Sequence, residues 1–148
     1  MGLSAKELKD RFVGAVFDSV EVPAEAEDMV NQALACGETD PRYTDPSHPE
    51  FQAPMNFATR YHGARMLPED FPEIDRRTMI DAGKAVEWKA PIRPGDTITA
   101  KSHLHDIYDK TGRSGTMLFL VQRMEFTNQR DELVSIVDWR LIVRGGLS

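Results

Sequence analysis

The second half of the chain alternates apolar and polar residues over long runs, which is typical of β-strands with one buried face. Four such runs follow one another: "GKAVEWKA", "DTITAKSHLHDIY", "SGTMLFLVQRMEFTN" and "DELVSIVDWRLIVR". The breaks between them, "RPGD", "DKTGRSG" and "NQRD", are rich in residues that favour turns. Four consecutive strands joined by such turns predict an antiparallel meander.

The first half of the chain predicts helices. Residues 4–11 form a short amphipathic pattern, and "FVGAVFDSVEV" after them is typical of extended chain. Pro23 then opens "AEAEDMVNQALAC", where acidic residues crowd the first turn and Gly37 stands at the position of a C-cap glycine. Apolar residues at helical spacing predict a further helix over residues 54–66.

A mostly apolar helix followed by long amphipathic strands predicts an α+β fold, because the inner face of the sheet needs a cover. A long central helix wrapped by a curved antiparallel sheet is the hot-dog fold. The chain has 148 residues, of which 41% are hydrophobic, and this is enough for one core. We therefore predict a single domain over residues 1–148.

Composition narrows the classes of function. The 24 acidic and 18 basic residues give a net charge of −6, so the chain offers no broad cationic surface and nucleic acid is not an expected partner. One cysteine, Cys36, excludes an intrachain disulfide, which fits a reducing compartment. The start of the chain lacks the pattern of a signal peptide, and no long apolar run is present. These observations predict a cytoplasmic protein that does not bind membranes.

An acidic stretch follows the second predicted helix and holds Glu38, Asp40 and Asp45 close together in "GETDPRYTDP". The residues alone allow two interpretations: a solvated polar turn, or a loop that carries acid and base groups. His48, in "DPSHPE", could supply an imidazole to Glu38 or Asp40, although a histidine between prolines is more often an exposed loop residue.

Other polar residues give weaker signals. His62 on the predicted helix is expected to be structural, and His103 and His105 share a strand face without a third ligand, so no metal site is predicted. Lys110 and Arg113 lie in the "KTGRSG" turn and could meet a phosphate as separate charges. A solvated hairpin is the simpler interpretation of that turn.

The segments "APMNF" and "PIRPGDTITAKSHLHDIYDKTGRSGTMLFLVQRMEFTNQRDELV" resemble the MaoC-like dehydratases, a family that includes (R)-specific enoyl-CoA hydratases. The resemblance is to the N-terminal, non-catalytic type of hot-dog domain, and it extends from residue 8 to the end. It implies a hot-dog fold, an acyl-CoA or acyl-carrier-protein thioester as substrate, and no cofactor besides that thioester. It also implies that two hot-dog domains pair around one substrate tunnel.

Family members that hydrate 2-enoyl thioesters carry the motif Gly-Asp-x-Asn-Pro-(Leu/Ile)-His, whose Asp and His hold and activate water. In this sequence Gly37 and Pro41 match the motif. Glu38 takes the place of the Asp, Asp40 that of the Asn, and Tyr43 that of the His. At neutral pH a phenol holds its proton too tightly to shuttle it as imidazole does. The resemblance therefore implies a degenerate catalytic dyad.

The family also polarises the thioester oxygen with backbone N–H groups at the start of its central helix. The matching positions here are Ala53, Pro54 and Met55. The sequence thus keeps the substrate-binding turn beside a loop that has lost its histidine.

These observations give one hypothesis and two alternatives. The hypothesis is a hot-dog subunit of a 2-enoyl-CoA, or acyl-carrier-protein, hydratase/dehydratase that shapes the acyl pocket as a homodimer or beside a catalytic hot-dog chain. The first alternative is a homodimer that binds an acyl thioester without converting it. The second is an active homodimeric hydratase that uses Glu38 or Asp40 with His48.

Overall fold

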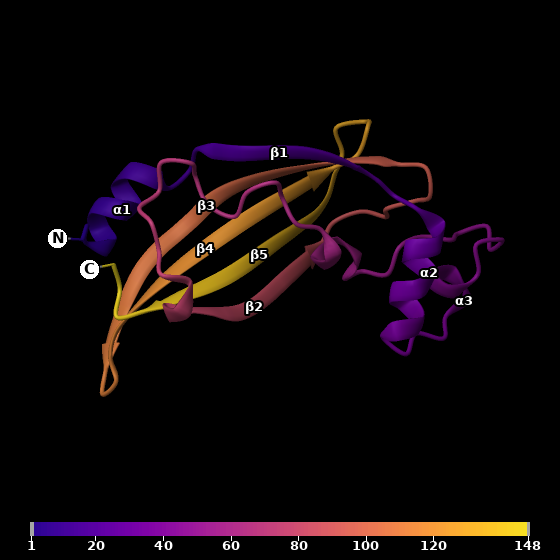
Figure 1. The fold of residues 1–148 in the computed structure, drawn as a ribbon. Helices are drawn as coiled ribbons and strands as arrows, with labels where there is room; N and C mark the ends of the chain where they lie inside the picture. The colour runs from indigo at the N-terminus through magenta and orange to yellow at the C-terminus, as the bar shows by residue number, and fades with distance from the viewer. Residues whose placement is uncertain (1, 148) are drawn as a thin grey trace.

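The computed structural model describes residues 2–147 and contains one curved antiparallel sheet with helices at both of its ends (Figure 1). The strands are β1 (Val16–Pro23), β2 (Met79–Trp88), β3 (Thr97–Gly112), β4 (Gly115–Thr127) and β5 (Leu133–Arg144). The helices are α1 (Ala5–Phe12), α2 (Ala26–Ala35) and α3 (Pro41–Thr44), with 3₁₀ turns η1 (Phe57–Arg60) and η2 (Arg76–Thr78). The predicted α+β class is confirmed.

None of the helices described over residues 2–147 has both the length and the apolar character needed to cross a membrane.

The strand order is β1-β3-β4-β5-β2, so the predicted meander is right for β3, β4 and β5 and wrong for β2. β2 pairs with β5 at one edge of the sheet, and the chain after it crosses to the opposite edge. There the Gly95 N–H donates to the Ala24 carbonyl and the Ala24 N–H to that of Asp96, at the end of β1. Alternation of apolar and polar residues reveals a strand but not its neighbour in the sheet. For this reason the predicted meander wrongly paired β2 with β3.

The helix predicted over residues 54–66 is wrong. Only Phe57–Arg60 form a 3₁₀ turn, and Tyr61 is extended with φ −84° and ψ 141°. Side chains from the strands bond the backbone groups that a helix would use internally. Lys84 Nζ donates to the Thr59 carbonyl at 2.9 Å, and the Ala64 N–H donates to Asp18 Oδ2 at 2.8 Å.

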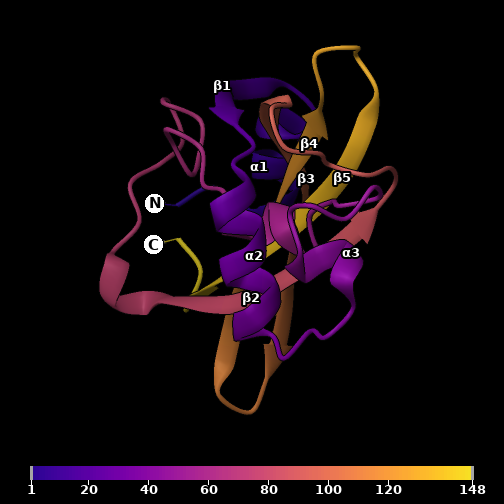
Figure 2. The same cartoon turned by 90° about the vertical axis from the view of Figure 1, so that its right-hand side faces the viewer.

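The helix that covers one end of the sheet is α2, which lies beside α3 in Figure 2. Acidic residues occupy its first turn, as predicted, but its N-cap is Glu25, because Pro23 is still the last residue of β1. Met29 on α2 and Phe57 on η1 are fully buried in the same apolar cluster as Phe126 of β4. The apolar spacing around Phe57 therefore marks core residues correctly, although the backbone there is not a helix.

The inner face of the sheet carries two apolar clusters. The α2-side cluster includes Met29, Phe57, Ile98, Met124 and Phe126. The α1-side cluster includes Leu8, Phe12, Leu104, Leu120 and Val143, and lies under α1.

The "RPGD" and "TNQ" turns are linked directly. Asp96 is buried; its Oδ2 accepts from the Arg93 N–H at 2.9 Å and its Oδ1 from Gln129 Nε2 at 2.9 Å. Gln129 Oε1 in turn accepts from the Thr97 N–H at 3.0 Å. The two motifs occur together because they join the turn before β3 to the turn after β4.

The outer face of the sheet carries a two-bond ion pair that predicts how stability depends on pH. Arg123 donates to Asp138 at 2.7 and 2.9 Å, and its guanidinium holds the pKa of the Asp138 carboxyl below its ordinary value. A lowered folded-state pKa means that Asp138 stabilises the fold above the unfolded pKa, and that this contribution is lost as the pH falls toward the folded pKa. Urea unfolding should therefore show Asp138→Asn to be less stable than the unaltered chain at pH 7, by about 1 kcal/mol.

The difference between Asp138→Asn and the unaltered chain should shrink as the pH falls below the ordinary aspartate value of 3.8. Asp109→Asn, at an exposed carboxylate on β3, is the matched control and should not lower the stability at pH 7 by a comparable amount. A pH dependence that Asp138→Asn does not alter would contradict this assignment.

Candidate functional site

The acidic loop begins where α2 ends in a glycine cap. Gly37 has φ +76°, its N–H donates to the Leu34 carbonyl at 3.0 Å, and the Glu38 N–H donates to the Ala33 carbonyl at 2.9 Å. This pair of bonds is the Schellman motif, and it confirms Gly37 as the C-cap glycine. The cap turns the chain sharply and delivers the candidate residues to the α2 end of the sheet.

The carboxylates of Glu38 and Asp40 both accept hydrogen bonds from groups of their own loop. Glu38 Oε1 accepts from the N–H groups of Thr39 and Asp40, each at 3.0 Å. Asp40 caps α3 by accepting from the Arg42 N–H at 2.9 Å, and its other oxygen accepts from the Arg42 guanidinium at 2.7 and 3.0 Å. The Arg42 guanidinium holds the pKa of Asp40 below its ordinary value. Asp40 is therefore a stable anion and a poor base.

The two candidate proton carriers lie in the same loop but are not joined to these carboxylates. Tyr43 is half-buried in α3, with the Arg42 guanidinium 5.5 Å from its ring centroid. His48 Nδ1 accepts from the Glu50 N–H at 3.0 Å. Over residues 2–147, no hydrogen bond connects the His48 ring to Glu38 or Asp40. The structure gathers the four predicted residues without forming a carboxylate–imidazole pair.

The predicted substrate-binding turn lies next to this loop. Ala53 and Pro54 are buried, the Ala53 N–H donates to the Ile92 carbonyl at 2.8 Å, and Met55 is 56% exposed. In the described part of the chain, the N–H groups of Met55 and Asn56 have no backbone acceptor. These two donors precede a 3₁₀ turn and are free to meet an oxygen atom from outside the chain.

Two residues that the sequence did not single out hold this turn against α2. Gln32 Nε2 donates to both the backbone and the side-chain oxygen of Asn56, each at 3.0 Å. Asn56 Nδ2 lies 3.5 Å from Cys36 Sγ. Gln32 and Asn56 are 24 positions apart and belong to no recognisable motif, so the sequence carries no signal for the contact.

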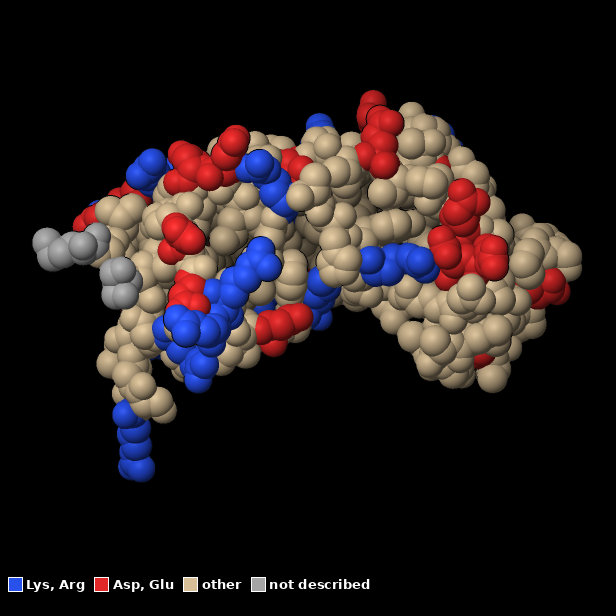
Figure 3. Space-filling view, in the orientation of Figure 1, with Lys and Arg blue, Asp and Glu red and all other residues tan. Residues whose placement is uncertain are grey.

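Lys110 and Arg113 lie far from the acidic loop. They belong to the hairpin between β3 and β4, at the end of the sheet opposite α2 (Figure 1). Lys110 Nζ lies 5.8 Å from the ring centroid of Tyr108 and 5.4 Å from that of Phe119, and these two rings are stacked. Figure 3 shows acidic side chains over α2 and basic ones toward the hairpin end. One chain therefore does not bring Lys110 or Arg113 to the acidic loop.

His103 and His105 lie close together, with ring centroids 5.8 Å apart. Within residues 2–147, no group of three histidine, cysteine, aspartate or glutamate side chains is arranged to hold a metal ion.

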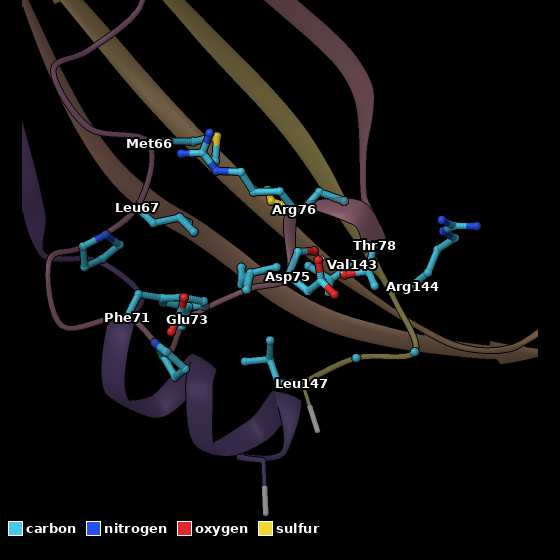
Figure 4. Close-up of a pocket in the computed structure, with 16 residues that line it drawn as sticks. Met66, Leu67, Phe71, Glu73, Asp75, Arg76, Thr78, Val143, Arg144 and Leu147 are labelled. Carbon is cyan, nitrogen blue, oxygen red and sulfur yellow. Dashed lines mark hydrogen bonds between the residues drawn. The ribbon is translucent and has the colours of Figure 1, made fainter.

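A cavity of about 910 Å³ lies at the α1 end of the sheet (Figure 4). Met66, Leu67 and Phe71 form part of its wall, and the Arg76 side chain extends toward Met66. None of the predicted site residues lines this cavity, so it is separate from the acidic loop.

The sequence of residues 11–137 matches the family model described as the FAS1-like, dehydratase domain region. No curated protein sequence matches the chain significantly.

Three solved structures show the same fold at low sequence identity. The MaoC-like dehydratase from Rhodospirillum rubrum has a TM-score of 0.63 and 22% identity, over 96% of this chain and 97% of that one. A chain of the ChsH1-ChsH2 complex from Mycobacterium tuberculosis gives 0.67 and 20%, over 94% and 92%. A chain of the C-terminally truncated HadBC (3R-hydroxyacyl-ACP dehydratase) complex from the same organism gives 0.66 and 20%, over 91% and 99%.

The family match covers most of the chain, and the predicted hot-dog fold is confirmed by the shared structure. This chain belongs to the family described as the FAS1-like, dehydratase domain region, and it has the α+β hot-dog fold.

Proposed function

We propose that the chain is a hot-dog subunit of a 2-enoyl thioester hydratase/dehydratase, and that it shapes the acyl pocket without performing the proton transfers. The observation that carries this proposal is the acidic loop: Tyr43 stands where the family has histidine, and the carboxylates of Glu38 and Asp40 are bound within the loop.

Hydration of an enoyl thioester needs a base that deprotonates water and an acid that protonates the α-carbon. This loop has neither in a paired arrangement, so a partner chain with the intact motif would supply both. The contribution of this chain would be the free N–H donors of Met55 and Asn56, which can stabilise negative charge on a thioester oxygen. Leu34 and Met55, 59% and 56% exposed, would provide apolar surface to the acyl group or to the partner.

The β2 edge of the sheet is the surface that best fits a partner. In the described part of the chain β2 pairs only with β5, so its other side presents unpaired backbone groups. Among residues 2–147, three of the seven exposed large hydrophobic residues, Ile80, Val86 and Trp88, belong to this strand. Two of the similar solved structures are complexes of two different chains by their descriptions, which supports a dimer of hot-dog chains here.

Assembly gives a direct prediction. Analytical ultracentrifugation at micromolar concentration should show a species of about twice 16.7 kDa, either alone or after addition of a catalytic hot-dog chain. Val86→Lys should weaken the dimer because it places a charge at the β2 edge, whereas Val16→Lys on the opposite edge should not. A clean 16.7 kDa monomer that does not shift when the second chain is added would refute the assembly.

Assays with crotonyl-CoA and a longer enoyl-CoA test the function. The chain alone should hydrate both at a rate near background, and a mixture with a hot-dog chain of the same genome that carries the intact motif should be active. Saturable binding of a saturated acyl-CoA with no activity in the mixture would favour the acyl-thioester-binding homodimer instead. High activity of the chain alone would favour the homodimeric hydratase.

A further inference from the structure

Residues 66–75 form an arch over the α1 end of the sheet, and this arch is fixed at two places. The Met66 carbonyl accepts from Gln122 Nε2 of β4 at 2.9 Å. Further along, the Phe71 ring packs on that of Phe12 on α1, with 4.9 Å between the ring centroids. The space enclosed by the arch, the end of the sheet and the segment after β5 is the cavity of about 910 Å³ in Figure 4.

Much of the cavity wall is apolar and accessible from within the cavity. Five side chains of the lining are only partly buried against the α1-side cluster, so they keep apolar surface that a ligand can cover: Met66, Leu67, Ile74, Met79 and Leu147. Small-molecule sites have volumes of roughly 300–1,000 Å³, and this cavity lies in that range. Covering the exposed part of such a wall with an alkyl chain is favourable.

Arg76 brings a positive charge to this wall. Its side chain lines the cavity, is exposed and extends toward Met66, so a ligand can reach the guanidinium (Figure 4). Within residues 2–147, no hydrogen bond or ion pair holds the Arg76 guanidinium, whereas the two arginines nearest to it are engaged. Arg77 donates to both oxygens of Asp75 at 2.9 to 3.2 Å. Arg144 donates to the Arg77 carbonyl at 3.1 Å.

The charged side chains of the lining favour a single negative charge on the ligand. They are Arg76 and Arg144, and the acids Glu73 and Asp75. Because Arg77 neutralises Asp75 from outside the lining, the two arginines remain against one carboxylate, that of Glu73. Figure 4 shows this carboxylate well away from the Arg76 guanidinium. A free guanidinium binds a carboxylate through two parallel N–H groups, so a monoanion of this kind fits the position.

We infer that this cavity is a binding site for a small amphipathic carboxylate. The carboxylate of the ligand binds the Arg76 guanidinium, and its alkyl chain lies against the partly exposed apolar side chains of the wall, beginning with Met66 and Leu67. The polar and the apolar parts of the lining then each have a counterpart in the ligand.

This site is separate from the one that carries the proposed function. No residue of the acidic loop or of the turn at residues 53–56 lines the cavity. Binding there requires neither hydratase activity nor a partner chain, so it can be measured on the chain alone. Failure of this inference and failure of the proposed function are therefore independent.

Octanoate, octan-1-ol and butyrate test the inference by isothermal titration calorimetry at pH 7. The first two have equally long chains and only octanoate is charged, whereas butyrate keeps the charge on a chain that is four methylenes shorter. We expect saturable binding of octanoate, about tenfold tighter than that of octan-1-ol because of the bond to Arg76. Butyrate should bind at least tenfold more weakly than octanoate. No saturable binding of octanoate, or an equal affinity for either of the other two, would overturn the inference.

Arg76→Gln should remove the preference for octanoate over octan-1-ol, and Arg76→Lys should keep part of it. Arg140→Gln is the matched control, because it removes the charge of an exposed arginine on β5 that does not line the cavity. A preference that persists in Arg76→Gln, or that Arg140→Gln removes equally, would overturn the inference. In the unaltered protein, nuclear Overhauser effects should connect the octanoate chain to the methyl groups of Leu67 and Ile74, and their absence would contradict the site.

Discussion

Replacing Tyr43 by histidine and Glu38 by aspartate together should raise the rate of crotonyl-CoA hydration above that of the unmodified chain. General acid–base catalysis contributes about a hundred- to ten-thousand-fold, and the unmodified loop has a tyrosine at the position where this step needs an imidazole. The scaffold around the loop keeps the Gly37 cap and the free N–H donors of Met55 and Asn56. The measurement is the loss of enoyl thioester absorbance under conditions of excess substrate.

Matched controls separate the effect of the imidazole from other changes in the loop. Tyr43→Phe removes only the hydroxyl, and Glu38→Asp alone only shortens the carboxylate side chain by one methylene, so neither should raise the rate. One result would assign catalysis to His48 instead. If the unmodified chain is strongly active, and His48→Ala abolishes this activity while a change at Tyr43 does not, the dyad has been relocated to His48.

Replacing Phe57 by alanine should lower the free energy of unfolding by about 3 to 5 kcal/mol. Phe57 has no exposed surface, its ring contacts Tyr61 edge-on at 5.6 Å between centroids, and it belongs to the α2-side cluster. The cost arises because truncation removes buried apolar surface and leaves a cavity. Urea unfolding followed by circular dichroism measures it.

Met55→Ala is the control for Phe57, because it lies two positions away in the same turn but is 56% exposed. Its effect on stability should stay within about 0.5 kcal/mol. Equal losses for the two variants would show that the turn, rather than burial of the ring, determines stability.

The strands and the helix cap could be predicted because their causes are local. Alternation over the last four runs located β2 to β5, and Gly37 marked the end of α2 because only glycine adopts its positive φ easily. The pairing of β2 with β5, and the loss of the helix over residues 54–66, depend on contacts between distant segments. The bonds from Lys84 to Thr59 and from Ala64 to Asp18 have no local signature.

In the candidate site, too, features with local causes could be predicted and features that depend on other contacts could not. Spacing placed Glu38, Asp40, Tyr43 and His48 in one loop, and the structure has them there. The sequence did not show that both carboxylates bind within the loop, because such bonds depend on backbone N–H directions.

Contacts of the site that join segments far apart in the chain could not be predicted from the sequence either. The bonds from Gln32 to Asn56 join segments 24 positions apart. The large separation of Lys110 and Arg113 from the loop follows from the length of β3 and β4.

The central claim is that catalysis resides in a partner chain while this chain shapes the pocket. The most direct test measures the hydration rate of the complex with that partner, after one of the two loops has been disabled. Glu38→Gln, Asp40→Asn and His48→Ala together in this chain should leave the rate within about threefold, whereas replacing the histidine of the partner's motif should lower it about a hundred- to ten-thousand-fold. A complex that loses its activity when this chain's loop is changed, and keeps it when the partner's histidine is replaced, would contradict the claim.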